Sequence, residues 1–145
     1  MSDGRPSWDE YFMAIAHLVK KRATCPRKSV GAVLVRDKQL VSSGYNGAPR
    51  GHKHCIEIGC ELVNNHCMRV VHAEQNVIAQ AASQGHSTEG STMYVTTYPC
   101  NICLKMAINA GIKELVYDED YPDPVVVNIL KEANVKFRKF DGKRI

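Results

Sequence analysis

The chain has 145 residues, of which 44% are hydrophobic and 23% are charged, without a repeat, low-complexity segment or linker. This length and composition predict a single domain over residues 1–145 with a buried core. The net charge of +4 suits anionic small molecules and does not require a nucleic acid partner. The polar first residues, MSDGRPSWDE, and the lack of a long apolar run argue against a secretory signal and a membrane span.

The first part of the chain predicts one helix followed by a β-hairpin. Ser7 and Glu10 form an S-x-x-E capping box, and an apolar stripe at helical spacing follows it. The first strand of the hairpin is densely apolar, which indicates burial on both faces. The predicted elements are a helix from about Trp8 to Arg22, strands at 30–36 and 40–44, and a turn at Asp37-Lys38.

Beyond residue 71, helical and strand patterns alternate along the chain. They predict helices at 72–83, 100–110 and 125–133 and strands at 93–96, 115–117 and 135–140. Such alternation implies parallel strand pairs with helical crossovers. We therefore predict an α/β fold with a mixed sheet of about five strands covered by helices, and a ligand site near strand ends and helix starts.

Two short motifs open two of these helices: VHAEQN at residues 71–76 and YPCNIC at residues 98–103. His72, Cys100 and Cys103 are three ligands of the kind that zinc prefers, and a catalytic site leaves the fourth position open. Glu74 can then move protons between water and a substrate. H-x-E followed by P-C-x-x-C is the signature of zinc nucleobase deaminases, whereas C-x-x-C alone could be a redox pair. Pro99 is expected at the first helical position, where the helix dipole favours thiolates at both cysteines.

Further metal-binding residue types occur in and before the irregular stretch 45–70. A second, structural zinc site is one explanation, and free buried cysteines are the other. A metal would fold a loop that buries little apolar surface. Six cysteines with this chemistry favour a reducing compartment, so we predict a cytoplasmic protein, or one of the host cytoplasm if it is viral. The predicted ligands of the second zinc are Cys25, Cys55, Cys60 and Cys67, with His66 as a possible substitute.

Over nearly its whole length the sequence resembles the cytidine deaminase-like superfamily. The resemblance is carried by WDEYFMAIAHLV, SVGAVLV, GYNGAPRG, HAEQN, YVTTYPCNIC and AGIKELVY. Within the superfamily, GYNGAPRG resembles the deoxycytidylate (dCMP) deaminases, and the Cys/His loop resembles their bacterial competence-associated (ComEB-type) and phage branches. The resemblance implies a three-layer fold and hydrolysis of dCMP to dUMP and ammonia for thymidylate synthesis. It implies zinc on His72, Cys100 and Cys103, attack of a zinc-bound water on C4 of cytosine, and proton transfer by Glu74.

The resemblance also implies contacts beyond the metal. Asn46 matches a position that contacts the substrate sugar, and Tyr121 matches a tyrosine near the substrate phosphate. Relatives are often hexamers that dCTP activates and dTTP inhibits, and Mg²⁺ could accompany a triphosphate. Arg27 and Lys28 are candidate phosphate ligands by their charge, although a solvated loop surface is an equal alternative. The implied effector-binding residues are Gly44, Tyr45, Gly47 and Arg50.

Three other functions remain open at this stage. A tRNA adenosine deaminase or another base deaminase would use the same metal centre on a flipped-out base, but should carry a broad basic face. A zinc-stabilised binding module without catalysis would leave Glu74 without a role. A deaminase of free nucleosides would lack a phosphate pocket. The predicted partners are thus dCMP, the two nucleotide effectors and further copies of the chain, without nucleic acid or membrane.

Overall fold

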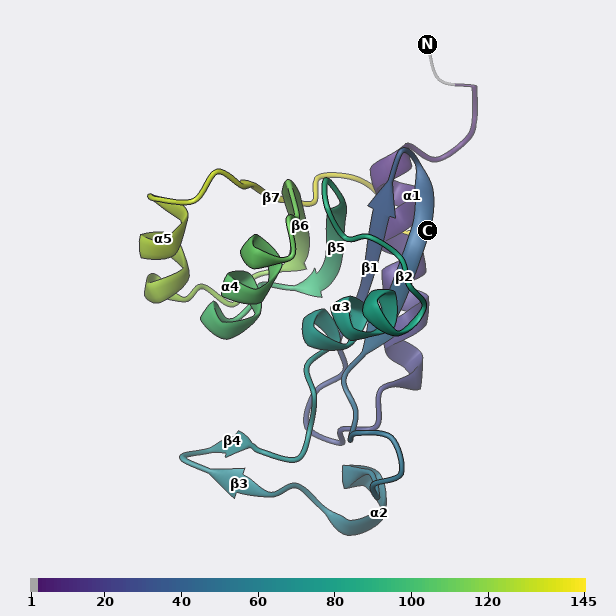
Figure 1. The fold of residues 1–145 in the computed structure, drawn as a ribbon. Helices are drawn as coiled ribbons and strands as arrows, with labels where there is room; N and C mark the ends of the chain where they lie inside the picture. Colours follow the sequence, from purple (N-terminus) through teal and green to yellow (C-terminus); the bar gives the residue numbers. More distant parts are fainter. Residues whose placement is uncertain (1–2) are drawn as a thin grey trace.

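The computed structural model describes residues 3–145, except for the side chain of His66 (Figure 1). Its helices are α1 (Trp8–Val19), the 3-10 turn η1 (Lys20–Arg22), α2 (Cys55–Ile58), α3 (Ala73–Ser83), α4 (Asn101–Asn109) and α5 (Pro124–Leu130). Its strands are β1 (Gly31–Arg36), β2 (Gln39–Tyr45), β3 (Leu62–Val63), β4 (His66–Cys67), β5 (Thr92–Thr97), β6 (Glu114–Glu119) and β7 (Lys136–Lys139).

Five strands form a mixed sheet in the order β2-β1-β5-β6-β7. Strand β1 is antiparallel to both β2 and β5, whereas β5 with β6 and β6 with β7 are parallel pairs. The parallel pairs are joined through α4 and α5, because a parallel connection must cross back along the sheet. The predicted α/β class and the parallel pairs beyond residue 71 are confirmed.

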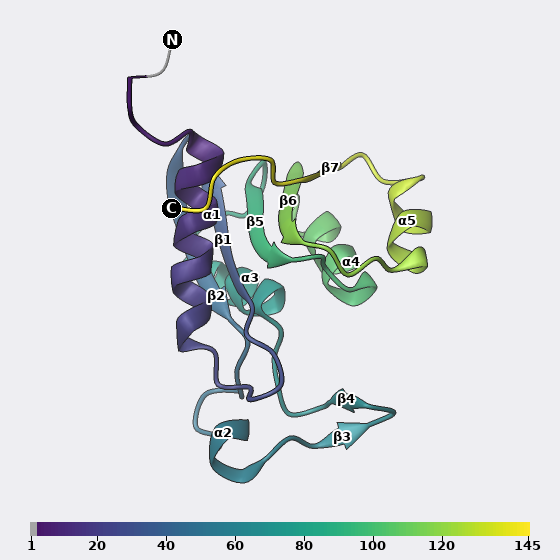
Figure 2. The same ribbon diagram turned by 180° about the vertical axis from the view of Figure 1, so that it is seen from behind.

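Helices cover both faces of this sheet, as Figure 2 shows from the side of α1. Along β1, Ala32 and Leu34 face the core shared with α3, α4 and α5, while Val33 and Val35 face the core shared with α1. This alternation follows from the two-residue period of a strand. All four side chains are buried, so the predicted burial of the first strand on both faces is confirmed, as are the three layers.

Tight turns with left-handed backbone close two hairpins. Asp37 and Lys38 have φ of 52° and 61°, as the predicted turn between β1 and β2 requires. Asn64 and Asn65 have φ of 50° and 63° and join β3 to β4 in a second, small hairpin. The sequence predicts an irregular loop here, and that prediction is wrong for this hairpin, although Asn-Asn is a signal for such a turn. The hairpin projects beyond the sheet together with α2 (Figure 1).

A network of charged side chains ties the start of α1 to the far strands. The Asp9 carboxylate accepts hydrogen bonds from Arg138 Nη1 at 2.6 Å and from the Tyr94 hydroxyl at 2.7 Å. Arg138 also donates from Nε to Glu114 at 3.2 Å. The hydrogen bond with Arg138 is the main reason that the pKa of Asp9 lies below its usual value.

We expect Asp9→Asn to lower the free energy of unfolding by about 1–3 kcal/mol at neutral pH. A depressed pKa in the folded state adds stability above the unfolded carboxyl pKa of about 4, and this stability is lost as pH falls through the folded value. The difference in the free energy of unfolding between parent and variant should therefore become smaller below about pH 4. Urea unfolding from pH 7 to pH 3 measures it. Asp120→Asn removes an exposed ion pair with Lys139 and should change stability much less.

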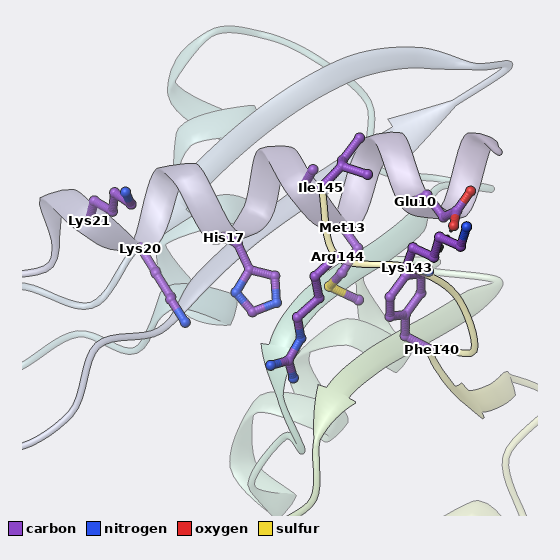
Figure 3. Close-up of a pocket in the computed structure, with 10 residues that line it drawn as sticks. Glu10, Met13, His17, Lys20, Lys21, Phe140, Lys143, Arg144 and Ile145 are labelled. Atoms are coloured by element: carbon purple, nitrogen blue, oxygen red, sulfur yellow. Dashed lines mark hydrogen bonds between the residues drawn. The ribbon is translucent and has the colours of Figure 1, made fainter. Parts of the chain in front are cut away.

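The C-terminal segment returns to the face covered by α1. Arg144 Nε donates to Asp118 at 2.8 Å, and His17 Nε2 lies 2.6 Å from the same carboxylate. Figure 3 shows the cavity of about 320 Å³ beside these residues, between α1, η1 and the segment from Phe140 to Ile145. Because α3 and α4 cover the other face, this cavity is separate from the predicted metal ligands. Among residues 3–145, no helix has both the length and the apolarity that crossing a bilayer requires.

Candidate active site

Three of the predicted metal ligands meet where α3 and α4 begin. His72 immediately precedes α3 and Cys100 immediately precedes α4, while Cys103 lies in the first turn of α4. His72 Nδ1 is 3.2 Å from Cys103 Sγ and 3.6 Å from Cys100 Sγ, and the two sulfurs are 3.3 Å apart. Residues that are separated by about thirty positions in the chain thus present their donor atoms to one point.

This donor set fits a zinc ion. Zinc–sulfur bonds of about 2.3 Å and zinc–nitrogen bonds of about 2.0–2.1 Å place tetrahedral donors about 3.5–3.8 Å apart. The observed separations of 3.2–3.6 Å are only slightly shorter, so a small outward shift of the side chains would admit the ion. One imidazole and two sulfurs also match the ligand types of catalytic zinc sites with one open position.

The start of α4 gives the two cysteines different environments. Cys100 Sγ accepts a hydrogen bond from the backbone N–H of Cys103 at 3.4 Å, so Cys100 caps the helix. Pro99 therefore lies one residue before the cap, and its predicted place at the first helical position is wrong. The hydrogen bond with the Cys103 thiol is the main reason that the pKa of Cys100 falls to about 4. The same contact and burial raise the pKa of Cys103, so the metal-free site favours a thiolate at Cys100 alone.

Glu74 is a buried acid beside these donors. Only 5% of Glu74 is exposed, although it is a residue type that is rarely buried without a partner. It lies in the first turn of α3, where its carboxyl group interacts with the Cys103 thiol. Burial raises the pKa of Glu74 above its ordinary value. A carboxyl group that binds its proton more tightly than usual is suited to accept and return one in a reaction.

Asn46 stands beside the start of α3 with its side chain held at both ends. Its Oδ1 accepts from Val30 N at 2.8 Å, and its Nδ2 donates to Lys28 O at 2.7 Å. An asparagine amide has two N–H donors and an oxygen with two acceptor positions, so each end keeps one free for a ligand. The next residue, Gly47, pairs with Val71 in an antiparallel bridge. Because His72 follows Val71, this bridge brings the backbone of Asn46 near that of His72.

The predicted phosphate-side residues Lys28 and Tyr121 lie together. The Lys28 ammonium is 4.8 Å from the centre of the Tyr121 ring, within the range of a cation–π contact. Tyr121 is 70% exposed and follows the carboxyl end of β6, so both polar groups are accessible. Arg27 is directed elsewhere, since Nη1 donates to Asn65 O at 3.3 Å in the turn of the β3–β4 hairpin.

A second group of donors forms around the small hairpin. The sulfurs of Cys55, Cys60 and Cys67 all lie within 4.8 Å of one another. Cys25 is outside this group. Burial is the main cause that raises the pKa of Cys60, and the charge of the nearby Cys25 adds to the effect. The side chain of His66, the predicted substitute, lies outside the part of the chain that the structure describes. Three of the four predicted cysteines therefore converge here.

Burial and backbone contacts distinguish the sulfurs of this second group. Burial, with hydrogen bonds to Cys67 and Cys60, raises the pKa of Cys55 to about 12. Burial would also raise the pKa of Cys67, but hydrogen bonds from backbone groups, chiefly that of Arg69, outweigh it and lower the pKa to about 7. Cys67 is therefore the cysteine of this group that loses its proton most easily, and the thiolate is the form that binds metal.

The predicted effector residues lie at the end of β2 and in the loop that follows it, and they differ in exposure. Gly44 and Gly47 are buried, Tyr45 is partly buried, and Arg50 is exposed with Nη2 3.4 Å from Ser83 Oγ. Their role in effector binding stays a prediction. Gly44 has a packing role that the sequence analysis missed: an added Cβ would lie 2.5 Å from the Val77 nitrogen of α3. Glycine permits β2 and α3 to approach this closely.

Thr24 is a further residue that sequence patterns did not single out. Its backbone N–H donates to Asn46 O at 3.1 Å, and its carbonyl accepts from Ile56 N at 3.1 Å. Its hydroxyl lies 2.9 Å from His54 Nδ1. Thr24 therefore connects the loop of Asn46 with the helix that carries Cys55. Its neighbour Cys25 was the available signal, because a lone cysteine before a cysteine-rich loop suggests that the two segments meet.

Comparisons with known proteins agree with this geometry. The sequence model described as "Cytidine and deoxycytidylate deaminase zinc-binding region" matches residues 6–119. The chain is 48% identical over 132 residues to ComE operon protein 2 of Bacillus subtilis, covering 90% of this chain and 70% of that protein. It is 36% identical over 143 residues to the deoxycytidylate deaminase of Saccharomyces cerevisiae, covering 94% of this chain but only 46% of that protein.

A solved structure extends the likeness to three dimensions. The dCMP deaminase of cyanophage S-TIM5, in complex with dCMP and dUMP, superposes with a TM-score of 0.82 at 32% sequence identity. The match covers 94% of this chain and 98% of that chain. The sheet, the helices and the motif-bearing helix starts therefore belong to a shared architecture.

Proposed function

The chain belongs to the cytidine and deoxycytidylate deaminase family, and from this premise we propose that it hydrolyses dCMP to dUMP and ammonia, which supplies dUMP for thymidylate synthesis. The observation that carries the proposal is the buried Glu74 beside the donor set of His72, Cys100 and Cys103. In the reaction, water adds at C4 of cytosine, the C4–N bond breaks, and the exocyclic amino group leaves as ammonia.

The residues of the site have different roles in this reaction. His72, Cys100 and Cys103 would hold zinc, which when bound acidifies water towards neutral pH. Glu74 takes a proton from the attacking water and delivers it to the ring nitrogen N3, and then takes the proton of the hydroxyl formed at C4 and delivers it to the departing amino group. Its burial supports this role, because proton exchange with bulk solvent is limited there. The free amide positions of Asn46 are suited to the sugar hydroxyl.

Release of ammonia from dCMP and from deoxycytidine, measured side by side on the zinc-loaded protein, tests the function. Turnover of dCMP well above that of deoxycytidine is the expected result. Equal turnover of both would replace the nucleotide by the free nucleoside as substrate. Turnover of neither, even with dCTP added, would reject the reaction while leaving the metal site in place. Deamination of a tRNA anticodon stem under the same conditions would then identify a base deaminase of the same fold.

We further propose that dCTP activates and dTTP inhibits the enzyme through the loop of Gly44, Tyr45, Gly47 and Arg50, with Mg²⁺ on the triphosphate. The exposed Arg50 supports this, because its guanidinium is available to a phosphate. A hexamer is the proposed assembly. Rates measured with each triphosphate, and the mass of the particle from sedimentation, test these two points. An unchanged rate with both nucleotides would reject the regulation, and a monomer would reject the assembly.

A second zinc at Cys55, Cys60 and Cys67, with Cys25 as the nearby fourth sulfur, is also part of the proposal. Three converging sulfurs support it, and Cys25 lies near enough to Cys60 for its charge to act there, as a fourth sulfur of a structural site would. Such an ion would hold α2 and the β3–β4 hairpin against the segment of Thr24. These short elements bury few apolar side chains, so they depend on a cross-link of this kind.

We expect Cys67→Ser to lower the zinc content from two ions per chain to one, because the thiolate most accessible at neutral pH is lost. The remaining ion should stay at the site of His72, so dCMP turnover should persist at reduced thermal stability. Metal analysis of the purified variant measures this. His66→Ala is the matched control: full zinc content is expected, and loss of an ion would instead place His66 among the ligands. One ion in the parent would contradict the second site.

A further inference from the structure

The side chain of Asn76 joins two backbone segments that approach the candidate active site. Its Nδ2 donates to Tyr45 O at 2.8 Å and, over a longer distance of 3.5 Å, to Val71 O. Asn76 lies on α3 one turn after His72, and its own N–H donates to His72 O at 2.8 Å. The side chain of Asn76 thus contacts the end of β2 and the segment before α3, and its backbone N–H contacts His72, the capping residue of α3.

The two carbonyl groups that Asn76 contacts have particular neighbours. Tyr45 directly precedes Asn46, and Val71 directly precedes His72. The two segments are also paired at Gly47 and Val71, with N–H to O distances of 3.1 Å and 2.8 Å in the two directions. Asn76 therefore supports this short bridge from the side of the helix. The bridge lies next to Asn46, the proposed sugar contact, and His72, a proposed zinc ligand.

The contact between β2 and α3 is also close at two further positions of β2. At Gly44 there is no room for a Cβ against the backbone of α3. Ser42 Oγ donates to Val77 O at 2.7 Å two residues earlier along β2. Ser42, Gly44 and Asn76 define what we call the β2–α3 seam. Asn76 is the member of this seam that lies next to both the Asn46 loop and the start of α3.

We infer that Asn76 is a positioning residue that sets the placement of Asn46 relative to His72 and Glu74. This inference rests on the proposed function, in which Asn46 binds the sugar and Glu74 transfers protons at the base. Sugar and base are covalently linked in one substrate, so the two protein groups must be held at a separation that suits both. Misplacement of a substrate by about 1 Å can cost about a hundredfold in rate.

The experiment compares Asn76→Ala with Ser42→Ala, which removes a side-chain hydrogen bond to a backbone carbonyl in the same seam but away from the site. The substrates are dCMP and 2′,3′-dideoxycytidine monophosphate, which lacks the sugar hydroxyl. Asn76→Ala should lower kcat/KM for dCMP about 10- to 100-fold, and the preference for dCMP over the dideoxy analogue should fall towards one. Ser42→Ala should keep both values within about twofold. Zinc content should be unchanged in both variants.

Several outcomes overturn the inference. Equal kcat/KM and an unchanged preference in Asn76→Ala would show that the residue serves the fold alone. The same kinetic loss in Ser42→Ala would show that any weakening of the seam suffices. If Asn76→Ala does not fold, Asn76→Leu, which keeps the size of the side chain but has no donor, is measured in the same way, and a retained preference for the sugar hydroxyl would again reject the inference.

A measurement without activity separates this inference from the proposed function. Hydrogen exchange at the amides of Gly47 and Val71 reports opening of the bridge that Asn76 braces. Exchange at both amides should be at least about tenfold faster in Asn76→Ala than in Ser42→Ala. If the parent does not deaminate dCMP but this difference is found, the proposed function fails and the placement by Asn76 stands. Equal exchange in the two variants would reject the placement, whatever the activity.

Discussion

Glu74→Gln is expected to lower kcat for dCMP deamination by about 10²–10⁴-fold, which is the usual contribution of a positioned acid–base group. Glutamine keeps the shape of the side chain and its ability to hydrogen bond, but it cannot take a proton from water or return one to the substrate. The zinc content and the KM for dCMP should change little, because the donor set and the substrate contacts remain. Steady-state kinetics with metal analysis on the same preparation measures both quantities.

Stability distinguishes this loss from a damaged fold. The raised pKa of Glu74 means that the folded metal-free chain holds this proton more tightly than the unfolded chain. An ionised Glu74 therefore opposes folding above the unfolded carboxyl pKa, and a neutral glutamine relieves the cost. Metal-free Glu74→Gln should unfold at the same temperature as the parent or above it at pH 7. Glu132→Gln, at an exposed position, should match the parent in rate. Full activity of Glu74→Gln would reject the proton-transfer role.

The core of the candidate site was predictable because its signals are local. His72 and Glu74 are two residues apart, and Cys100 and Cys103 are three apart, so each motif fits one helix start. Both starts lie at the edge of the α/β architecture where ligands bind, which the alternation of helices and strands had indicated. Pro99 shows where such local reasoning fails. Cys100 occupies the capping position through its own sulfur, so the helix begins at Asn101, two residues after Pro99.

Contacts between distant segments were not predictable in the same way. Asn76 looks like an ordinary polar residue on a helix, and only the approach of β2 to α3 gives its amide two carbonyl partners. Cys25 was predicted as an equal ligand of the second zinc, but its sulfur lies outside the group that Cys55, Cys60 and Cys67 form. The β3–β4 hairpin was missed because strands of two residues carry no periodic pattern.

Lys28→Met is expected to reduce kcat/KM for dCMP about 10- to 100-fold and to leave deoxycytidine unaffected. The proposed partner of the Lys28 ammonium is the substrate phosphate, and a charge-assisted hydrogen bond contributes about 1.5–3 kcal/mol. Methionine keeps the length and apolar contact of the side chain over the Tyr121 ring but removes the charge. The position of Asn46 should be preserved, because it bonds to the backbone carbonyl of Lys28 and not to the ammonium.

The division of this loss between the kinetic constants identifies its origin. The phosphate is remote from C4 and is bound equally before and during the reaction, so its loss should raise KM and leave kcat nearly constant. The parent's preference for dCMP should also weaken with added salt, and this dependence should shrink in the variant. Lys113→Met makes the same change of charge just before β6, at the end of the strand opposite to Tyr121. It should keep the parent's preference for dCMP over deoxycytidine. An equal loss for deoxycytidine would instead assign Lys28 to the nucleoside part of the substrate.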